Sequence, residues 1–351
     1  MPPEWISSPE EFRSFILQAH SESVNALRMG TGGSGIHVGI ADSAATLSDE
    51  TIDTTTVVSD CGGSFIDLDE PITNPHAKHV FRQLKHYAPF IDVSFYQVID
   101  DNGDLGVEAY HDAIDAAMDD EVDLLNLSLG DPWDVPRYAH PLYKKTQSAI
   151  EAGITIVAAA GHEKPGHDSK PPVHVPAVVD GVIAVNGFVS HCPESKDTVH
   201  DSEGTGPYYL EHEQDVDHWV PDGVYCGYNG CSGQSCIGRQ TEENWPRNPR
   251  PSNGKPDVAA PVVFPVCEND VFEFKSGSSY AAPVVTGVLA SAFGDILDEG
   301  GEIPTPTQAR EIITSTASPL RDGDCGVVDG FAAHQRFKER YTSVEPSQHT
   351  G

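Results

Sequence analysis

The chain has 351 residues, of which 54 are acidic and 21 basic, giving a formal net charge of −33. This charge would repel phosphate groups, which excludes a general nucleic-acid-binding surface. The length is sufficient for one large domain or two ordinary domains with a sizeable buried core.

The surplus of Asp and Glu over Lys is similar to that of proteins from salt-accumulating haloarchaea. Molar salt reduces the Debye length to about 3 Å and screens the repulsion between the charges. The alternative is an acidic protein of an ordinary organism. The N-terminal sequence M-P-P-E-W-I-S-S-P-E-E-F contains no basic region, long apolar run or twin arginine, which predicts a cytoplasmic location. No segment approaches the roughly 18 apolar residues of a membrane span, so no membrane partner is expected.

Strands and helices are expected to alternate along the chain. Helical spacing of apolar residues predicts a helix over 8–27. Short β-rich runs alternate with further helical patterns, which favours an α/β fold with a mainly parallel sheet and right-handed crossovers. The expected strands lie at 36–41, 93–99, 122–130 and 153–161, and the expected helices at 107–119 and 140–152.

Three polar residues occupy positions where such folds place their chemistry. Asp42 follows the first strand, and the carboxyl ends of parallel strands are where α/β sheets place their sites. Ser279 precedes a small-residue helix, whose free N–H groups favour negative charge developing nearby. His76 and His79 lie three residues apart. Each residue taken alone has another interpretation. Asp42 could simply end a strand, and Ser279 could cap a helix. The two histidines could bind a metal or lie on the surface.

The segment G-S-S-Y-A-A-P around Ser279 resembles the G-T-S-M-A-x-P signature of the subtilisin-like serine proteases, the subtilases. The segments G-I-A-D-S and N-P-H-A-K-H-V resemble the aspartate and histidine motifs of the same family. The resemblance runs from about residue 20 to 340 and implies a three-layer, doubly wound α/β fold. It implies a catalytic triad of Asp42, His76 and Ser279, which occur in the family's order.

The resemblance also assigns residues to the substrate cleft. Position 162 holds histidine where the family has the asparagine of the oxyanion hole, so the expected oxyanion donors are His162 and the backbone N–H of Ser279. Ala77, Lys78, Ser278 and Tyr280 are further departures from the family pattern. The implied substrate-binding residues, in two segments that border the specificity pocket, are Ser128, Leu129, Gly130, Ala159 and Gly161.

Residues 190–253 interrupt the pattern and resemble an insertion in a single peptidase domain that spans 1–351 without a prodomain. Cys192, Cys226, Cys231 and Cys236 lie in this insertion. Three of them are spaced five residues apart, and zinc binding, a disulfide and free thiols all remain open. Family members often bind calcium, but no motif here assigns its ligands, and no cofactor is expected for catalysis.

The resulting expectation is a serine endopeptidase that forms an acyl-enzyme and acts on proteins or peptides. The departures from the family motifs leave one alternative. In it, the same fold is catalytically weak or inactive and binds extended peptides or a partner protein.

Overall fold

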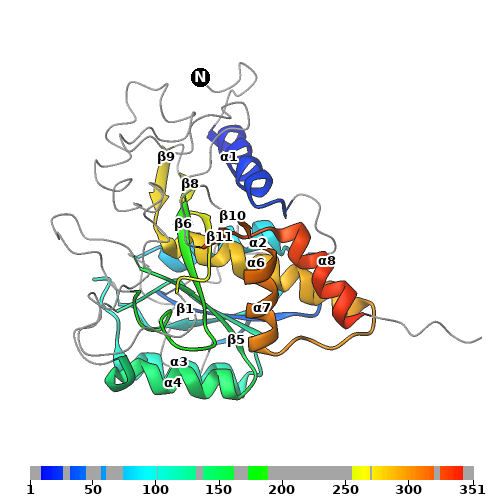
Figure 1. Cartoon of the computed structure of the whole chain (residues 1–351). Helices are drawn as coiled ribbons and strands as arrows, with labels where there is room; N and C mark the ends of the chain where they lie inside the picture. The colour runs from blue at the N-terminus through cyan, green and yellow to red at the C-terminus, as the bar shows by residue number, and fades with distance from the viewer. Residues whose placement is uncertain are drawn as a thin grey trace, which may run out of the picture.

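A computed structural model describes residues 9–26, 32–44, 57–60, 74–100, 102–131, 137–161, 173–188, 255–268, 271–319 and 325–342. Figure 1 shows one twisted sheet with helices on both faces. The elements occur in the chain order α1 (Pro9–Ser23), β1 (His37–Asp42), β2 (Val57–Asp60), α2 (His76–Tyr87), β3 (Asp92–Gln97), α3 (Val107–Asp119), β4 (Leu124–Leu127), a 3₁₀ turn (Arg137–Ala139), α4 (Pro141–Glu151), β5 (Thr155–Ala159), β6 (Ile183–Phe188), β7 (Val258–Pro261), β8 (Val263–Glu268), β9 (Val271–Ser276), α6 (Ser278–Asp298), α7 (Pro306–Thr316), β10 (Ser318–Pro319), β11 (Gly326–Val327) and α8 (Gly330–Tyr341).

The sheet has nine strands in the order β10-β11-β7-β6-β5-β4-β1-β3-β2. Every neighbouring pair is parallel except β10 and β11. The strand order reverses direction beside β1, which carries Asp42 at its carboxyl end. The predicted mainly parallel, doubly wound α/β fold is therefore confirmed, and its reversal point is where such sheets place ligand sites.

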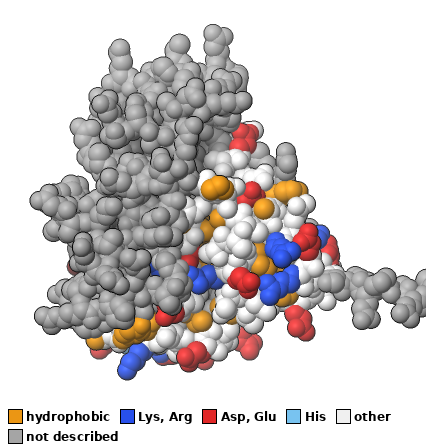
Figure 2. All heavy atoms as spheres, viewed as in Figure 1, with side chains coloured by type: hydrophobic (Ala, Val, Ile, Leu, Met, Phe, Trp, Pro, Cys, Tyr) orange, Lys and Arg blue, Asp and Glu red, His pale blue; other side chains and the backbone are white. Residues whose placement is uncertain are grey.

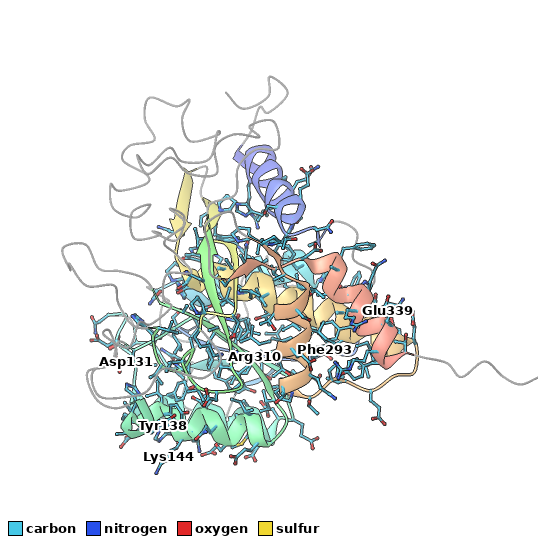
Figure 3. All side chains as sticks on the ribbon, viewed as in Figure 1. Asp131, Tyr138, Lys144, Phe293, Arg310 and Glu339 are labelled. Atoms are coloured by element: carbon cyan, nitrogen blue, oxygen red, sulfur yellow. The ribbon has the colours of Figure 1, made fainter. Side chains whose placement is uncertain are left out.

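Two hydrophobic clusters show that the sheet lies between two layers of helices. One cluster joins one face of the sheet to α2, α6, α7 and α8, and the other joins the opposite face to α3 and α4. In Figure 3, Tyr138 and Lys144 lie on the α4 side, while Phe293 and Glu339 lie on the side of α6 and α8. The strands read as nearly continuous apolar runs because both faces are covered.

Helix α6 is the central helix of the larger layer, and nearly all of its side chains are buried. A Cβ at Gly287 would lie 2.6 Å from the Cβ of Tyr87, so glycine lets α6 approach α2 closely. By length and composition α6 could cross a membrane, contrary to the expectation from the sequence. However, 94% of its most apolar window is buried inside the protein, as in the core helix of a globular domain.

The segment that leads to α6 forms an antiparallel hairpin, β8–β9, outside the main sheet. Phe264 of β8 packs with Leu17 of α1 and Tyr280 of α6 in a small separate hydrophobic cluster. Figure 1 shows α1 and the hairpin together at one end of the molecule. The predicted N-terminal helix is therefore confirmed, and it packs close to the beginning of α6.

The start of β7 is held by a buried charged group. Lys255 binds the carbonyl of Val182 and the carboxylate of Asp257, the latter at 2.6 Å, and Arg310 of α7 also contacts Asp257 at 2.6 Å. Burial lowers the pKa of Lys255 to about 8, although the negative charge of Asp257 opposes the shift. This group anchors residues 255–257 to β6 and α7.

The exposed basic residues described near the C-terminus are paired with acids. Lys338 contacts Glu299, Arg340 lies 3.6 Å from Glu311, and Arg336 lies 3.2 Å from Glu339. Figure 2 shows blue and red side chains intermixed on this face. Such exposed pairs contribute little stability each.

Candidate active site

Asp42 and His76 form a hydrogen-bonded pair. Asp42 ends β1, and His76 is the first residue of α2. His76 Nδ1 lies 2.7 Å from Asp42 Oδ1, and the Asp42 side chain is completely buried. A carboxylate can only accept here, so Nδ1 carries the proton and the neutral ring leaves Nε2 free to accept one.

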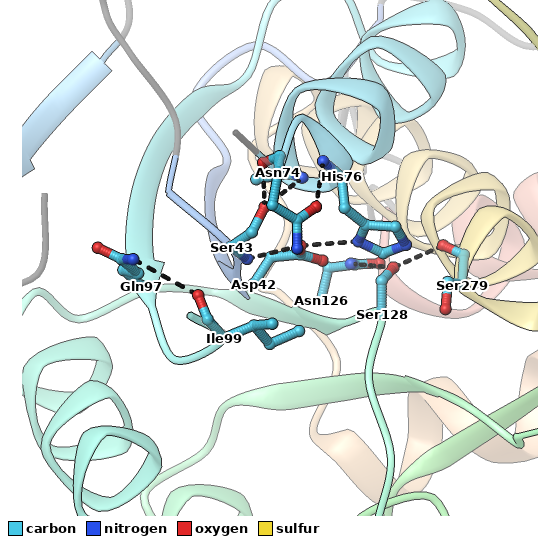
Figure 4. Close-up of polar contacts among 10 residues, drawn as sticks. Asp42, Ser43, Asn74, His76, Gln97, Ile99, Asn126, Ser128 and Ser279 are labelled. Atoms are coloured by element: carbon cyan, nitrogen blue, oxygen red, sulfur yellow. Dashed lines mark hydrogen bonds and ion pairs between the residues drawn. The ribbon is translucent and has the colours of Figure 1, made fainter. Parts of the chain in front are cut away.

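The surroundings of Asp42 keep the pair in place. The backbone N–H of Ser43 donates to Asp42 Oδ1 at 2.7 Å. The Ser43 hydroxyl accepts from the N–H of Ala77 and donates to the carbonyl of Asn74, both at 3.0 Å. The loop before α2 is thereby tied to the end of β1, as Figure 4 shows.

Two opposing effects act on the pKa of His76. Burial would lower the pKa, but the negative charge of Asp42 and the hydrogen bond that His76 donates to it outweigh burial, so the pKa of His76 is raised above 6.5. Histidine can take up a proton and return it during one reaction cycle, and the raised pKa stabilises the protonated ring that forms in between.

Ser279 is the second residue of α6 and is partly exposed. Figure 4 shows the His76 ring between Asp42 and Ser279. The ring of the adjacent Tyr280 lies 5.3 Å from the His76 ring between centroids. Within the described residues, no hydrogen bond joins the Ser279 hydroxyl to His76, and this pair is often loose before substrate binds.

The backbone of Ser279 has an unusual partner because of a proline. Pro283 lies four residues further along α6 and has no N–H, so it cannot bond the Ser279 carbonyl as a helix normally would. The hydroxyl of Ser128, just after β4, donates to this carbonyl at 2.7 Å instead. The backbone carbonyl of the predicted nucleophile therefore has a hydrogen-bond donor at the end of a sheet strand instead of one within its own helix.

Ser128 is itself held by a buried chain of hydrogen bonds. Asn126 Nδ2 donates to Ser128 Oγ at 2.8 Å, and Thr286 Oγ1 donates to Asn126 Oδ1 at 2.9 Å. All three side chains are buried. In the sequence, Asn126 stands out as a polar residue at the end of the apolar run L-L-N-L, whereas nothing distinguishes Thr286.

Ser278 stands where the family has threonine, and its hydroxyl is hydrogen-bonded to the backbone of Gly161. Its Oγ donates to the Gly161 carbonyl at 3.1 Å and lies 3.2 Å from the Gly161 N–H. The beginning of α6 is thus fastened to the loop after β5 as well as to the residue after β4.

Tyr280, which replaces the family's methionine, is part of an aromatic ledge made by Tyr280 and Phe264. The two rings stack at 5.7 Å with an interplanar angle of 13°. His76 lies against Tyr280, and His79 lies 5.9 Å from Phe264. The second motif histidine is therefore buried in packing beside the predicted base rather than exposed.

The predicted substrate-binding residues line the carboxyl ends of β4 and β5. The side chains of Leu129 and Ala159 are buried, so these residues can offer a substrate only their backbone. Gly130 and Gly161 are partly exposed, and both lie against the ring of His174. His174 was missed because nothing in the sequence P-V-H-V-P links it to the site.

The remaining predicted residues lie outside the described residues. They are His162, Cys192, Cys226, Cys231 and Cys236. Within the described ranges, no three His, Cys, Asp or Glu side chains gather where they could hold a metal ion. Zinc or calcium binding therefore stays a prediction, which metal analysis of the purified protein would test.

A buried aspartate, a histidine and a serine arranged around the switch point of a parallel sheet are typical of a serine hydrolase. The sequence pattern of the subtilase family, Peptidase S8, matches residues 33–341. The chain therefore belongs to the subtilase family, the subtilisin-like serine peptidases.

Individual relatives match shorter stretches. The chain is 27% identical over 147 residues to an intracellular serine protease of Paenibacillus polymyxa, covering 41% of this chain and 42% of that protein. It is 36% identical over 90 residues to the major intracellular serine protease of Bacillus subtilis (strain 168), covering 26% of this chain and 27% of that protein. It is 29% identical over 110 residues to the minor extracellular protease Epr of the same organism, covering 31% and 16%. These matches span less than half the length of each relative.

Solved structures share the fold across most of the chain. The prenylagaramide maturation protease PagA superposes with a TM-score of 0.58 at 18% identity, covering 90% of this chain and 97% of that one. A cold-adapted subtilisin-like serine proteinase gives a TM-score of 0.55 at 19% identity, covering 86% and 89%. None of these comparisons supports a haloarchaeal source, which stays an interpretation of the charge.

Proposed function

We propose that the protein is a serine endopeptidase that cleaves proteins or peptides with Asp42, His76 and Ser279. The observation that carries the proposal is the 2.7 Å hydrogen bond from His76 to a fully buried Asp42, with the ring facing the start of α6. Membership of the subtilase family supports the same reaction.

In the proposed reaction, the Ser279 hydroxyl attacks the substrate carbonyl while His76 Nε2 takes its proton. The peptide C–N bond then breaks, and His76 returns the proton to the leaving amine. Water attacks the acyl-enzyme by the same route and frees Ser279. Asp42 holds the ring in the correct tautomer and stabilises its positive charge, which agrees with the raised pKa of His76.

Oxyanion stabilisation is proposed to come from the Ser279 N–H and the His162 ring. An imidazole N–H can donate as the family's asparagine does. His162→Ala is expected to lower kcat by about 10- to 1,000-fold with little change in KM, while His162→Asn keeps or raises activity. Full activity of His162→Ala across the pH range would remove His162 from this role.

The direct test is hydrolysis of an unfolded protein substrate in molar KCl, followed by mass spectrometry of the products. The wild-type protein should generate peptides, and Ser279→Ala should not. Ser291→Ala is the matched control, because Ser291 is a buried serine on the same helix but far from its N-terminus. Binding of peptides without hydrolysis by the folded wild-type protein would favour the inactive, peptide-binding alternative.

A cytoplasmic location is proposed as well. Two of the relatives are named as intracellular proteases, and one is named as extracellular. Cys325 is disulfide-bonded. Disulfides are uncommon in a reducing cytosol, so this bond favours an extracellular location instead. Cell fractionation with an antibody against the chain would decide: recovery only from the medium would overturn the proposal.

A further inference from the structure

His174 fills the space between the ends of β4 and β5. A Cβ built on Gly130 would lie 2.7 Å from His174 Cβ, and one built on Gly161 would lie 2.5 Å from His174 Cγ. Real Cβ atoms do not approach this closely, so only glycine fits on either side of the ring. The two glycines therefore make room for an imidazole that belongs to the protein itself.

Backbone hydrogen bonds fix His174 in this position. Its N–H donates to the Ala160 carbonyl at 3.0 Å. Asp131 and Val175 exchange bonds of 2.8 and 3.2 Å, forming a short antiparallel bridge. His174 thus spans from the end of β5 to the end of β4, and Figure 3 places Asp131 at the edge of the molecule away from α8.

The same two segments hold the predicted nucleophile. Ser128, two residues before Gly130, binds the Ser279 carbonyl, and Gly161 binds the Ser278 hydroxyl. The family resemblance implies that these segments border the specificity pocket, so we expect the side chain of a substrate residue whose carbonyl meets Ser279 to enter the space between them. The imidazole already occupies that space, and only 8% of His174 is exposed.

We propose that His174 determines specificity by closing the pocket between Gly130 and Gly161. The residue before the scissile bond is then restricted to short side chains such as Gly, Ala or Ser. This inference rests on the proposed peptidase function, because it names the substrates of that same site.

The kinetic test compares peptides with Ala or Phe before the scissile bond. The wild-type protein should prefer Ala. His174→Ala should raise kcat/KM for the Phe peptide by about 10- to 100-fold, because each methylene of pocket space is worth roughly that order of discrimination, and should change the Ala peptide far less. An unchanged Ala-to-Phe ratio in the folded variant would overturn the proposal.

His140→Ala is the matched control. His140 is also buried, and it contacts Asp131 at 3.2 Å, directly after Gly130, but it does not lie between the two glycines. It should leave the ratio unchanged while showing a comparable loss of thermal stability. If His174→Ala does not fold, His174→Asn should produce a smaller shift in the same direction.

A second measurement separates this inference from the proposed reaction. Peptides ending in Ala or Phe are titrated against Ser279→Ala and against Ser279→Ala/His174→Ala, so that no catalysis is needed. A gain in Phe affinity in the double variant supports the pocket even if the wild-type protein hydrolyses nothing. Hydrolysis by the wild-type protein without any such gain leaves the peptidase proposal standing and refutes the role of His174.

Discussion

The two groups expected to exchange a proton are held by different means. The Ser279 carbonyl accepts a hydrogen bond from the Ser128 hydroxyl, and the Ser278 hydroxyl is hydrogen-bonded to the backbone of Gly161. The His76 ring is hydrogen-bonded to Asp42 through Nδ1 and rests against Tyr280 of the aromatic ledge. Directional bonds fix the position of a peptide group, whereas ring packing limits tilt but permits small rotation.

The largest expected effect comes from replacing the charged hydrogen-bond partner of the His76 ring. Asp42→Asn should lower kcat by about 10⁴-fold, because the amide favours the wrong tautomer of the ring. Catalysis needs neutral His76, so activity falls as pH falls through the pKa of His76. Without the carboxylate charge that raises this pKa, the acid limb of kcat/KM should move to lower pH.

The acid limb is measured with one peptide substrate from pH 5 to 9. Asp115→Asn is the control, because Asp115 is an exposed carboxylate on α3 paired with Lys145. An acid limb at the same pH in Asp42→Asn and the wild-type protein would show that His76 does not titrate as described.

The next largest effect is a loss of stability on removing the hydrogen bond from Ser128 to the Ser279 carbonyl. Ser128→Ala leaves the Ser279 carbonyl without a partner, which should lower the free energy of unfolding by about 1–3 kcal/mol. Pro283→Ala restores the N–H that α6 lacks, so Ser128→Ala should cost about 1 kcal/mol less in that background. Chemical denaturation of the four proteins measures the coupling, and strictly additive losses would contradict the proline account.

Substitutions in the aromatic ledge of Tyr280 and Phe264 should have a smaller effect on catalysis. Tyr280→Met should lower kcat by about 10-fold with little change in KM and shift the acid limb, because the His76 ring loses its flat neighbour. Tyr280→Phe keeps the ring and should behave like the wild-type protein. Tyr143→Met removes a buried aromatic ring on the other face of the sheet, so equal kcat losses in Tyr280→Met and Tyr143→Met would mean that only stability had changed.

Salt should change the stability of the whole protein without changing the relative effects of the substitutions at Ser128 and Tyr280. Repulsion within a chain of net charge −33 is screened at molar KCl, so the melting temperature should rise by at least about 5 °C from low salt. The ratios of variant to wild-type kcat should hardly change. An unchanged melting temperature would remove the halophilic interpretation without affecting the site.

The sequence was informative where a residue's role depends on its own segment. Asp42 at a strand end and helix 107–119 were both predicted, and the structure has them there. Apolar strands and capped helices are local patterns, and the motif order indicated how the strands would assemble.

What the sequence did not reveal depends on contacts between distant segments. The aromatic ledge requires α1 and β8 to meet the start of α6, and His174 becomes relevant only when β4 and β5 lie side by side. The β8–β9 hairpin was missed although V-F-P-V-C-E-N-D-V-F-E-F contains a turn between apolar runs. Its strands pair with each other and extend no family motif, so nothing drew attention to them.

The central claim is that Asp42 and His76 activate Ser279, and the most direct measurement is the rate of fluorophosphonate labelling as a function of pH in molar KCl. The account predicts that mass spectrometry finds the label on Ser279. It also predicts that the rate rises through a midpoint above pH 6.5 and is lost in His76→Ala. Absence of labelling in the folded wild-type protein, or equal labelling of His76→Ala, would contradict it.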